Sequence, residues 1–193
     1  MNFLAHLYLA ESTPEAWIGN LLPDLCKPKD WQRLPEAFQK GCYHHQWVDK
    51  LTDQHPTFVT LKSTLSSDRR RYAGIILDVC LDHYLARNWH LHHPQSLTEF
   101  LAQVYPHFHA PGVTLPERPQ RVLGSIASQD WLSGYGEMAG LARAFQGLSR
   151  RMRFNNHLAG AEDEFARQYD TWMAGFAEIL TSVAEQTKVA RRD

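Results

Sequence analysis

The segment from Tyr72 to His90 carries two aspartates on its most apolar side if it folds as a helix. Each helical residue turns by about 100°, so Asp82 lies about 40° from Asp78, and Leu85 lies about 20° from it. Burying an unpaired carboxylate costs several kcal/mol, and two carboxylates one turn apart also repel each other. A divalent cation would solve both problems. An ion pair with an arginine is the alternative interpretation.

A second polar pair lies in a helix predicted over residues 35–54. His45 and Asp49 are one turn apart, and they share a side of this helix with Phe38 and Cys42. Alone, the pair is typical of a satisfied polar contact. Together with the two aspartates of the other helix, it offers the mixed nitrogen and oxygen ligands of a metal site.

Hydrophobic periodicity and helix-breaking residues predict helices along almost the whole chain. No window shows the sustained two-residue alternation that indicates a β-strand. We therefore expect one all-α domain of about eight helices over residues 1–193. The predicted helices lie near residues 3–8, 14–22, 35–54, 57–65, 69–90, 96–106, 120–133, 137–151 and 161–187.

Asp24 directly follows Pro23, where the second helix is predicted to stop. A loop aspartate often caps a turn, which is the simpler interpretation. A loop position would also let this carboxylate approach a site from outside the helices.

The composition is that of an ordinary globular domain, with 44% apolar residues and a net charge of -1. This charge predicts no attraction to nucleic acid or membrane, and no apolar run is long enough to cross a bilayer. The three cysteines form no CxxC pair, so we expect free thiols and a cytoplasmic location. Eleven histidines favour metal or acid–base chemistry.

Four stretches of the sequence resemble the acyl carrier protein phosphodiesterases. In chain order they are NFLAHLYLA, GNLLPD, HQWVDKLTD and LDVCLDHYLARNW. The resemblance implies an all-α fold akin to HD-domain phosphohydrolases. It also implies hydrolysis of the phosphodiester that joins 4′-phosphopantetheine to a serine of holo-acyl carrier protein. The implied cofactor is a divalent metal, usually manganese, with magnesium or iron also suited to such ligands.

Carried over by position, the resemblance implies a set of metal ligands: Asp24, His45, Asp49, Asp78, Asp82 and His83. Four of these residues are also expected to be catalytic: Asp24, His45, Asp78 and His83. His6 and Asn20 match the family pattern too, although on sequence grounds His6 is interpreted as a core histidine.

Acyl carrier proteins are acidic, so the implied partner should meet a locally basic surface. Two arginine clusters are candidates. The first contains Arg69, Arg70 and Arg71, and the second contains Arg150, Arg151 and Arg153. Solvated helix ends would explain either cluster without a function. Two rival functions are a metal phosphohydrolase acting on a nucleotide or another small phosphodiester, and a non-catalytic helical binding protein.

Overall fold

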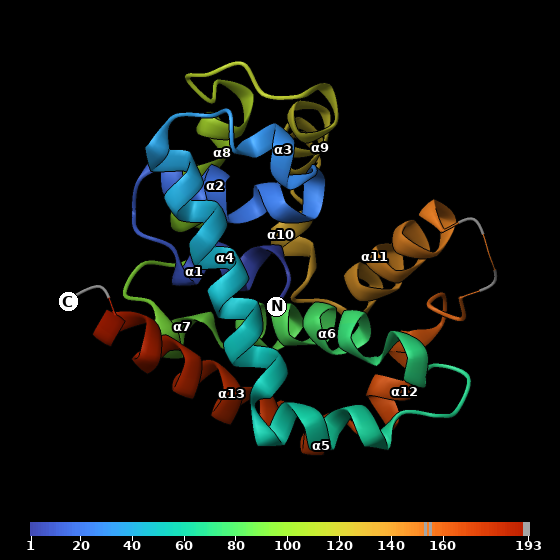
Figure 1. The fold of residues 1–193 in the computed structure, drawn as a ribbon. Helices are drawn as coiled ribbons and strands as arrows, with labels where there is room; N and C mark the ends of the chain where they lie inside the picture. Colours follow the sequence, from blue (N-terminus) through green and yellow to red (C-terminus); the bar gives the residue numbers. More distant parts are fainter. Residues whose placement is uncertain (153, 155, 191–193) are drawn as a thin grey trace.

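The computed structural model describes residues 1–152, 154 and 156–190, and within this part it contains helices and no β-strand (Figure 1). The all-α prediction is confirmed. The described residues form thirteen α-helices rather than about eight, because several are single turns. They are α1 (Phe3–Leu9), α2 (Pro14–Leu25), α3 (Pro28–Trp31), α4 (Glu36–Gln54), α5 (Pro56–Thr64), α6 (Ala73–Arg87), α7 (Trp89–His92), α8 (Leu97–His109), α9 (Glu117–Ser128), α10 (Trp131–Gly134), α11 (Met138–Arg151), α12 (Ala161–Arg167) and α13 (Tyr169–Ala190). A 3-10 turn, η1 (Arg70–Tyr72), precedes α6.

Three long predicted helices are divided in the structure. The helix expected over residues 69–90 becomes η1, α6 and α7, because the backbone leaves the helical region at Tyr72 (φ -109°, ψ 13°) and Asn88 (φ -108°, ψ 18°). Asp130 has a left-handed backbone (φ 47°) and separates α9 from α10. In the third case, a break at Gln168 separates α12 from α13.

Helix α2 continues two residues past Pro23, so the prediction that Asp24 lies in a loop is wrong. Proline removes one backbone donor and is costly in a helix interior, but Pro23 lies in the last turn. The helical pattern still closes beyond it, where the amide of Cys26 donates to the carbonyl of Leu22 at 2.9 Å. Asp24 is therefore held by a helix.

Helices α2 and α4 approach each other backbone to backbone where two glycines meet. A Cβ atom on Gly41 would lie 2.8 Å from the Cα of Gly19, so neither position accepts a side chain without movement. This close approach places His45 of α4 beside the next residue of α2, Asn20.

The N-terminal helix α1 lies in the middle of the fold, and the chain's N-terminus lies beside α4 and α6 (Figure 1). Helices α5 and α13 lie at one end of the molecule, and α8 and α9 lie at the other. The hydrophobic core runs between them and includes Leu4, Ile18, Leu77 and Trp172, each fully buried. No helix in the described residues is long and apolar enough to cross a membrane.

A buried ion pair connects α12 to the turn before α6. The Glu164 carboxylate is 4% exposed and accepts hydrogen bonds from the Arg69 guanidinium and the Ser66 hydroxyl, each at 3.0 Å. Burial raises the pKa of Glu164, but the hydrogen bonds from Ser66 and Arg69 outweigh this effect, so the net pKa is lowered.

We expect Glu164→Gln to lower the free energy of unfolding by about 2 kcal/mol at pH 7, because it removes the buried anion that accepts hydrogen bonds from Ser66 and from the partly buried Arg69 guanidinium. A carboxyl with a lowered folded-state pKa stabilises the fold above its unfolded pKa and loses this effect as the pH falls. Urea unfolding should therefore show that the difference in free energy of unfolding between wild type and Glu164→Gln shrinks as the pH falls from 7 to 3. Asp163→Asn, an exposed acid in the same first turn, is the matched control and should cost little.

Candidate metal centre

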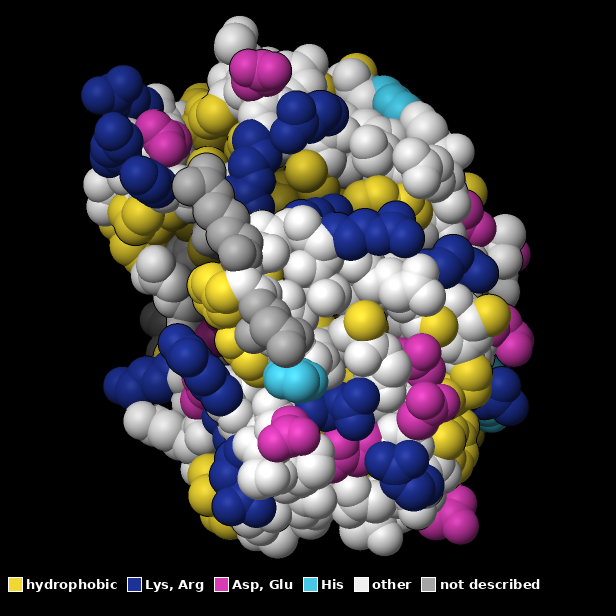
Figure 2. Space-filling model, turned by 90° about the vertical axis from the view of Figure 1, so that its right-hand side faces the viewer, with side chains coloured by type: hydrophobic (Ala, Val, Ile, Leu, Met, Phe, Trp, Pro, Cys, Tyr) yellow, Lys and Arg dark blue, Asp and Glu magenta, His cyan; other side chains and the backbone are white. Residues whose placement is uncertain are grey.

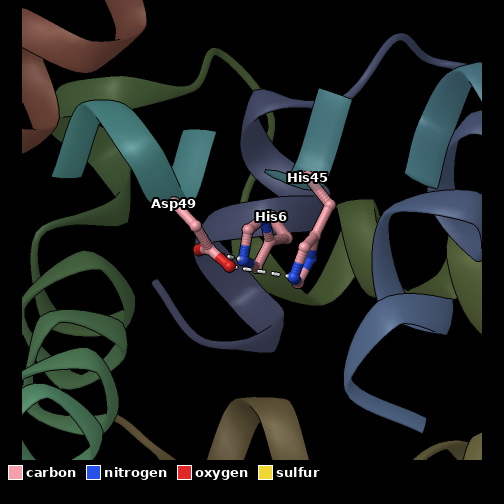
Figure 3. Close-up of side chains that lie close together, drawn as sticks. All are labelled: His6, His45 and Asp49. Atoms are coloured by element: carbon pink, nitrogen blue, oxygen red, sulfur yellow. Dashed lines mark ion pairs between the residues drawn. The ribbon is translucent and has the colours of Figure 1, made fainter. Parts of the chain in front are cut away.

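Three side chains from α1 and α4 converge beside the N-terminus of the chain: His6, His45 and Asp49 (Figure 3). One ligand atom from each lies within 4.8 Å of the other two. The Nε2 atoms of the two histidines lie 3.1 Å (His6) and 3.0 Å (His45) from the Asp49 carboxylate, and the two imidazole rings stack with centroids 3.8 Å apart. We call these residues the histidine–aspartate cluster.

The orientation of His45 is set by α2. Its Nδ1 atom lies 2.7 Å from the Asn20 carbonyl oxygen, which can only accept, so Nδ1 carries a proton. Nε2 then faces the Asp49 carboxylate with either a second proton or a lone pair. Metal-bound histidines in proteins commonly donate their other ring N–H to a carbonyl in this way, which leaves one nitrogen for the ion.

Burial and the neighbouring charges tune the two histidines in opposite directions. Burial lowers the pKa of His6 to about 3, and the proximity of His45 adds to this effect, so His6 is neutral at pH 7. Burial also lowers the pKa of His45, but the hydrogen bond and charge of Asp49 outweigh it and the net pKa is raised. His6 Nδ1 is buried and has no hydrogen-bond partner among the described residues.

The amino group of Met1 is the cation nearest to this cluster among the described residues. It lies 2.9 Å from Asp49 and 3.1 Å from Asp78. Burial lowers its pKa, but the two carboxylates outweigh this effect and raise the pKa to about 11. Asp78 is therefore near the cluster and faces inward as predicted, but its partner here is an ammonium group. Burial raises the pKa of Asp78, which the ammonium partly offsets.

The carboxylate of Asp49 stays ionised. Burial raises its pKa, but hydrogen bonds from the two histidines outweigh this effect. The Met1 ammonium lowers the pKa further, so that it lies well below the usual range of an aspartate.

Asp82 is fully buried on the apolar face, as its helical position predicts, but it lies outside the cluster. Its two carboxylate oxygens accept hydrogen bonds from the backbone amides of Leu4 (2.8 Å) and Ala5 (2.9 Å) at the start of α1. These amides have no partner within their own helix, and a helix N-terminus favours negative charge. Among the described residues, the direct partners of Asp82 are therefore these two amides rather than an arginine, and its role as a metal ligand stays a prediction.

The remaining predicted residues occupy different places. His83 is buried, and its ring nitrogens face the Tyr135 carbonyl at 2.8 Å and the Tyr169 hydroxyl at 3.2 Å, away from the cluster. Asp24 lies beside the cluster, with its Oδ1 atom 3.7 Å from Nε2 of His45. Burial raises the pKa of Asp24 above its ordinary value, so part of its population holds a proton at a higher pH than usual.

Sequence reasoning interpreted His6 as a core histidine and therefore missed it as a candidate ligand. Its signal was the match of the N-terminal stretch to the family pattern. Its distance from Asp49 depends on how α1 packs against α4, which periodicity does not reveal.

The fold and this cluster define an all-α protein with a candidate metal centre of two imidazoles and a carboxylate, bordered by Asp24 and Asp78. Such a mixed nitrogen and oxygen set fits a divalent cation such as manganese or iron.

The family model described as acyl carrier protein phosphodiesterase matches residues 1–183, and the chain belongs to this family. Relatives named acyl carrier protein phosphodiesterase include those of Photorhabdus laumondii, 31% identical over 97% of this chain and 96% of the relative, and Serratia proteamaculans, 32% identical over 97% and 98%. The Yersinia pestis relative is 34% identical over 90% of this chain and 96% of its own length. No solved structure matches the chain. The expected likeness to HD-domain proteins therefore stays a prediction.

We expect Asp82→Ala to lower the free energy of unfolding by about 2–4 kcal/mol, because two buried amides lose their acceptor. Asp82→Asn keeps an acceptor and should cost less. Burial raises the pKa of Asp82 to about 7, so between about pH 4 and pH 7 the folded state retains a proton that the unfolded state has released.

This difference in bound protons makes the wild type lose stability as the pH rises through that window. Urea unfolding in the presence of a chelator should therefore show the wild type losing more free energy of unfolding than Asp82→Asn does between pH 5 and pH 8. A parallel pH dependence of the two proteins would contradict the assignment.

Proposed function

We propose that this protein hydrolyses the phosphodiester between 4′-phosphopantetheine and the serine of holo-acyl carrier protein, releasing the apo-protein. The observation that carries the proposal is the histidine–aspartate cluster in a chain of this family. The Asp49 side chain of the cluster is 37% exposed and that of the neighbouring Asp24 is 41% exposed, so a bulky substrate can reach the cluster.

The cluster is proposed to bind a divalent cation, with manganese expected and magnesium or iron as alternatives. The neutral state of His6, the tautomer of His45 and the ionised Asp49 support this, because metal ligands must bind deprotonated. When bound, the cation supplies positive charge to the phosphodiester and makes a water more acidic for attack on phosphorus.

One group of the chain is placed to supply a proton during hydrolysis. The departing serine alkoxide needs one, and a carboxyl with a raised pKa is better suited to donate it than an ordinary aspartate. The pKa of Asp24 is raised, and its carboxyl lies beside the cluster, 3.7 Å from Nε2 of His45. His83, also expected to be catalytic, has both ring nitrogens engaged elsewhere and is assigned no direct role here.

Incubation with holo-carrier protein and manganese, followed by mass spectrometry of the carrier, tests the proposal. We expect loss of the prosthetic-group mass, abolished by EDTA. Asp49→Asn should lower the rate about 100-fold or more and weaken manganese binding measured by calorimetry. Asp53→Asn is the control, because this exposed residue of the same helix contacts only Lys62 among the described charged groups.

A metal phosphohydrolase that acts on a nucleotide or another small phosphodiester would use the same cluster. It would hydrolyse nucleotide diesters as fast as holo-carrier protein, and wild-type assays on both substrates distinguish the two proposals. A non-catalytic binding protein would show no hydrolysis of either.

The acidic carrier protein is proposed to dock on arginines of α9 and α11. These side chains line two adjoining hollows that share Trp131 and Arg151, and no ion pair to a carboxylate engages them within the described part of the chain. Figure 2 shows Lys and Arg side chains gathered around apolar atoms on this side of the molecule. The arginines concerned are Arg118, Arg121, Arg143, Arg150 and Arg151.

The other predicted cluster has contacts within the fold. Arg69 donates to Glu164 and to the His157 carbonyl, and Arg70 donates to two carbonyls at the C-terminal end of α5. Arg71 lies over aromatic rings. Arg153, predicted as part of the second cluster, lies outside the described residues.

Charge reversal separates the two arginine clusters. We expect the double variant Arg118→Glu, Arg121→Glu to raise KM for holo-carrier protein about tenfold at low salt, and less at high salt. Arg71→Glu is the control and should leave KM unchanged. Turnover of a small generic phosphodiester should not respond to either variant, because it makes no contact with this surface. An equal KM for wild type and double variant would exclude docking here.

A further inference from the structure

A cavity of about 450 Å³ lies between the start of the chain, α10 and α11. Within its lining Asn2 donates a hydrogen bond to the Tyr135 hydroxyl at 3.0 Å, and Phe3 forms part of the wall. Trp131 and Leu148 also line the cavity. The lining is thus mixed: aromatic and aliphatic surface lies beside polar groups and four charged side chains, which are Asp130, Arg143, Arg150 and Arg151.

The first two residues of the chain lie between this cavity and the candidate metal centre. Asn2 lines the cavity, while the amino group of the preceding residue, Met1, contacts Asp49 and Asp78. Consecutive Cα atoms are about 3.8 Å apart, so the two sites are separated by about one residue of chain. A substrate with its phosphodiester at the histidine–aspartate cluster therefore has the cavity beside it.

One face of α11 forms a wall of the cavity and carries Gly140, Ala144 and Gly147 about one turn apart. Gly140 is required by packing, because a Cβ atom there would collide with the Gly134 carbonyl. Gly147 is different: a Cβ atom there would meet nothing within 4 Å. Packing therefore does not explain its missing side chain, whereas an open cavity does.

We infer that this cavity binds the pantetheine arm of the substrate, an inference that rests on the proposed function. The arm is an uncharged chain with a geminal dimethyl group, a hydroxyl, two amides and a terminal thiol. Its methyl groups match the Phe3, Trp131 and Leu148 surface, and its amides and hydroxyl match polar groups such as Asn2. The volume falls within the range of about 300–1,000 Å³ typical of ligand pockets.

Gly147→Leu fills the cavity and tests the inference, with Gly124→Leu as its matched control. Gly124 is also a half-buried helical glycine with nothing within 4 Å of an added Cβ atom, but it does not line the cavity. Both variants should fold with an unchanged or higher Tm, because leucine favours helix over glycine. Circular dichroism establishes this before any assay.

Calorimetry with pantetheine alone gives the direct readout. We expect wild type and Gly124→Leu to bind pantetheine, and Gly147→Leu to bind at least about tenfold more weakly, which corresponds to a loss of about 1.4 kcal/mol. The KM for holo-carrier protein should rise in Gly147→Leu alone, while hydrolysis of bis(p-nitrophenyl) phosphate, which lacks the arm, stays at the wild-type rate.

The outcomes separate the two proposals. One outcome would overturn the cavity assignment alone. In it, the wild type hydrolyses holo-carrier protein, but Gly147→Leu has the same KM and the same pantetheine affinity as the wild type. If the wild type hydrolyses no holo-carrier protein with manganese, magnesium or iron, the proposed function is overturned, and the cavity assignment with it.

Discussion

The contact between the Asp82 carboxylate and the first amides of α1 is the interaction on which the site depends. It joins a buried acid of α6 to a helix N-terminus, and it satisfies groups that would each be costly to bury alone. The two amides belong to the residues directly before His6, so the contact also fixes where this imidazole lies. A seven-residue helix has too few turns to be stable by itself, and α1 is ordered by this anchor and by its buried apolar residues.

The second constraint is the charge balance around Asp49. Its carboxylate faces two imidazoles and the Met1 ammonium, and the neighbouring carboxylates of Asp78 and Asp24 add negative charge. The Met1 ammonium offsets part of this charge, and the raised pKa of His45 favours a proton on its imidazole that would offset more. A divalent cation would offset it in their place, so metal binding should release a proton from the cluster.

Helical periodicity was sufficient to predict the all-α class and the inward positions of Asp82 and His45, because one-turn spacing fixes which residues share a face. It could not identify the partner of Asp82, since that depends on α1, about 80 residues earlier in the chain. The same limit explains why His6 was interpreted as a core residue. The loop prediction for Asp24 failed for a local reason, because a proline in a last turn permits two further helical residues.

The chemistry and the proposed selectivity lie in different parts of the chain. The histidine–aspartate cluster is built from α1 and α4, and nothing in its ligand chemistry distinguishes one phosphodiester from another. Selectivity must therefore come from surfaces that contact the groups on either side of phosphorus. Helices α9 to α11 carry the arginine-rich face proposed for the acidic protein and line the cavity proposed for the uncharged arm, and Arg151 lines both hollows. A substrate that has only one of these two features should gain only part of the binding energy, so that recognition of the carrier and of its arm reinforce each other at one catalytic centre.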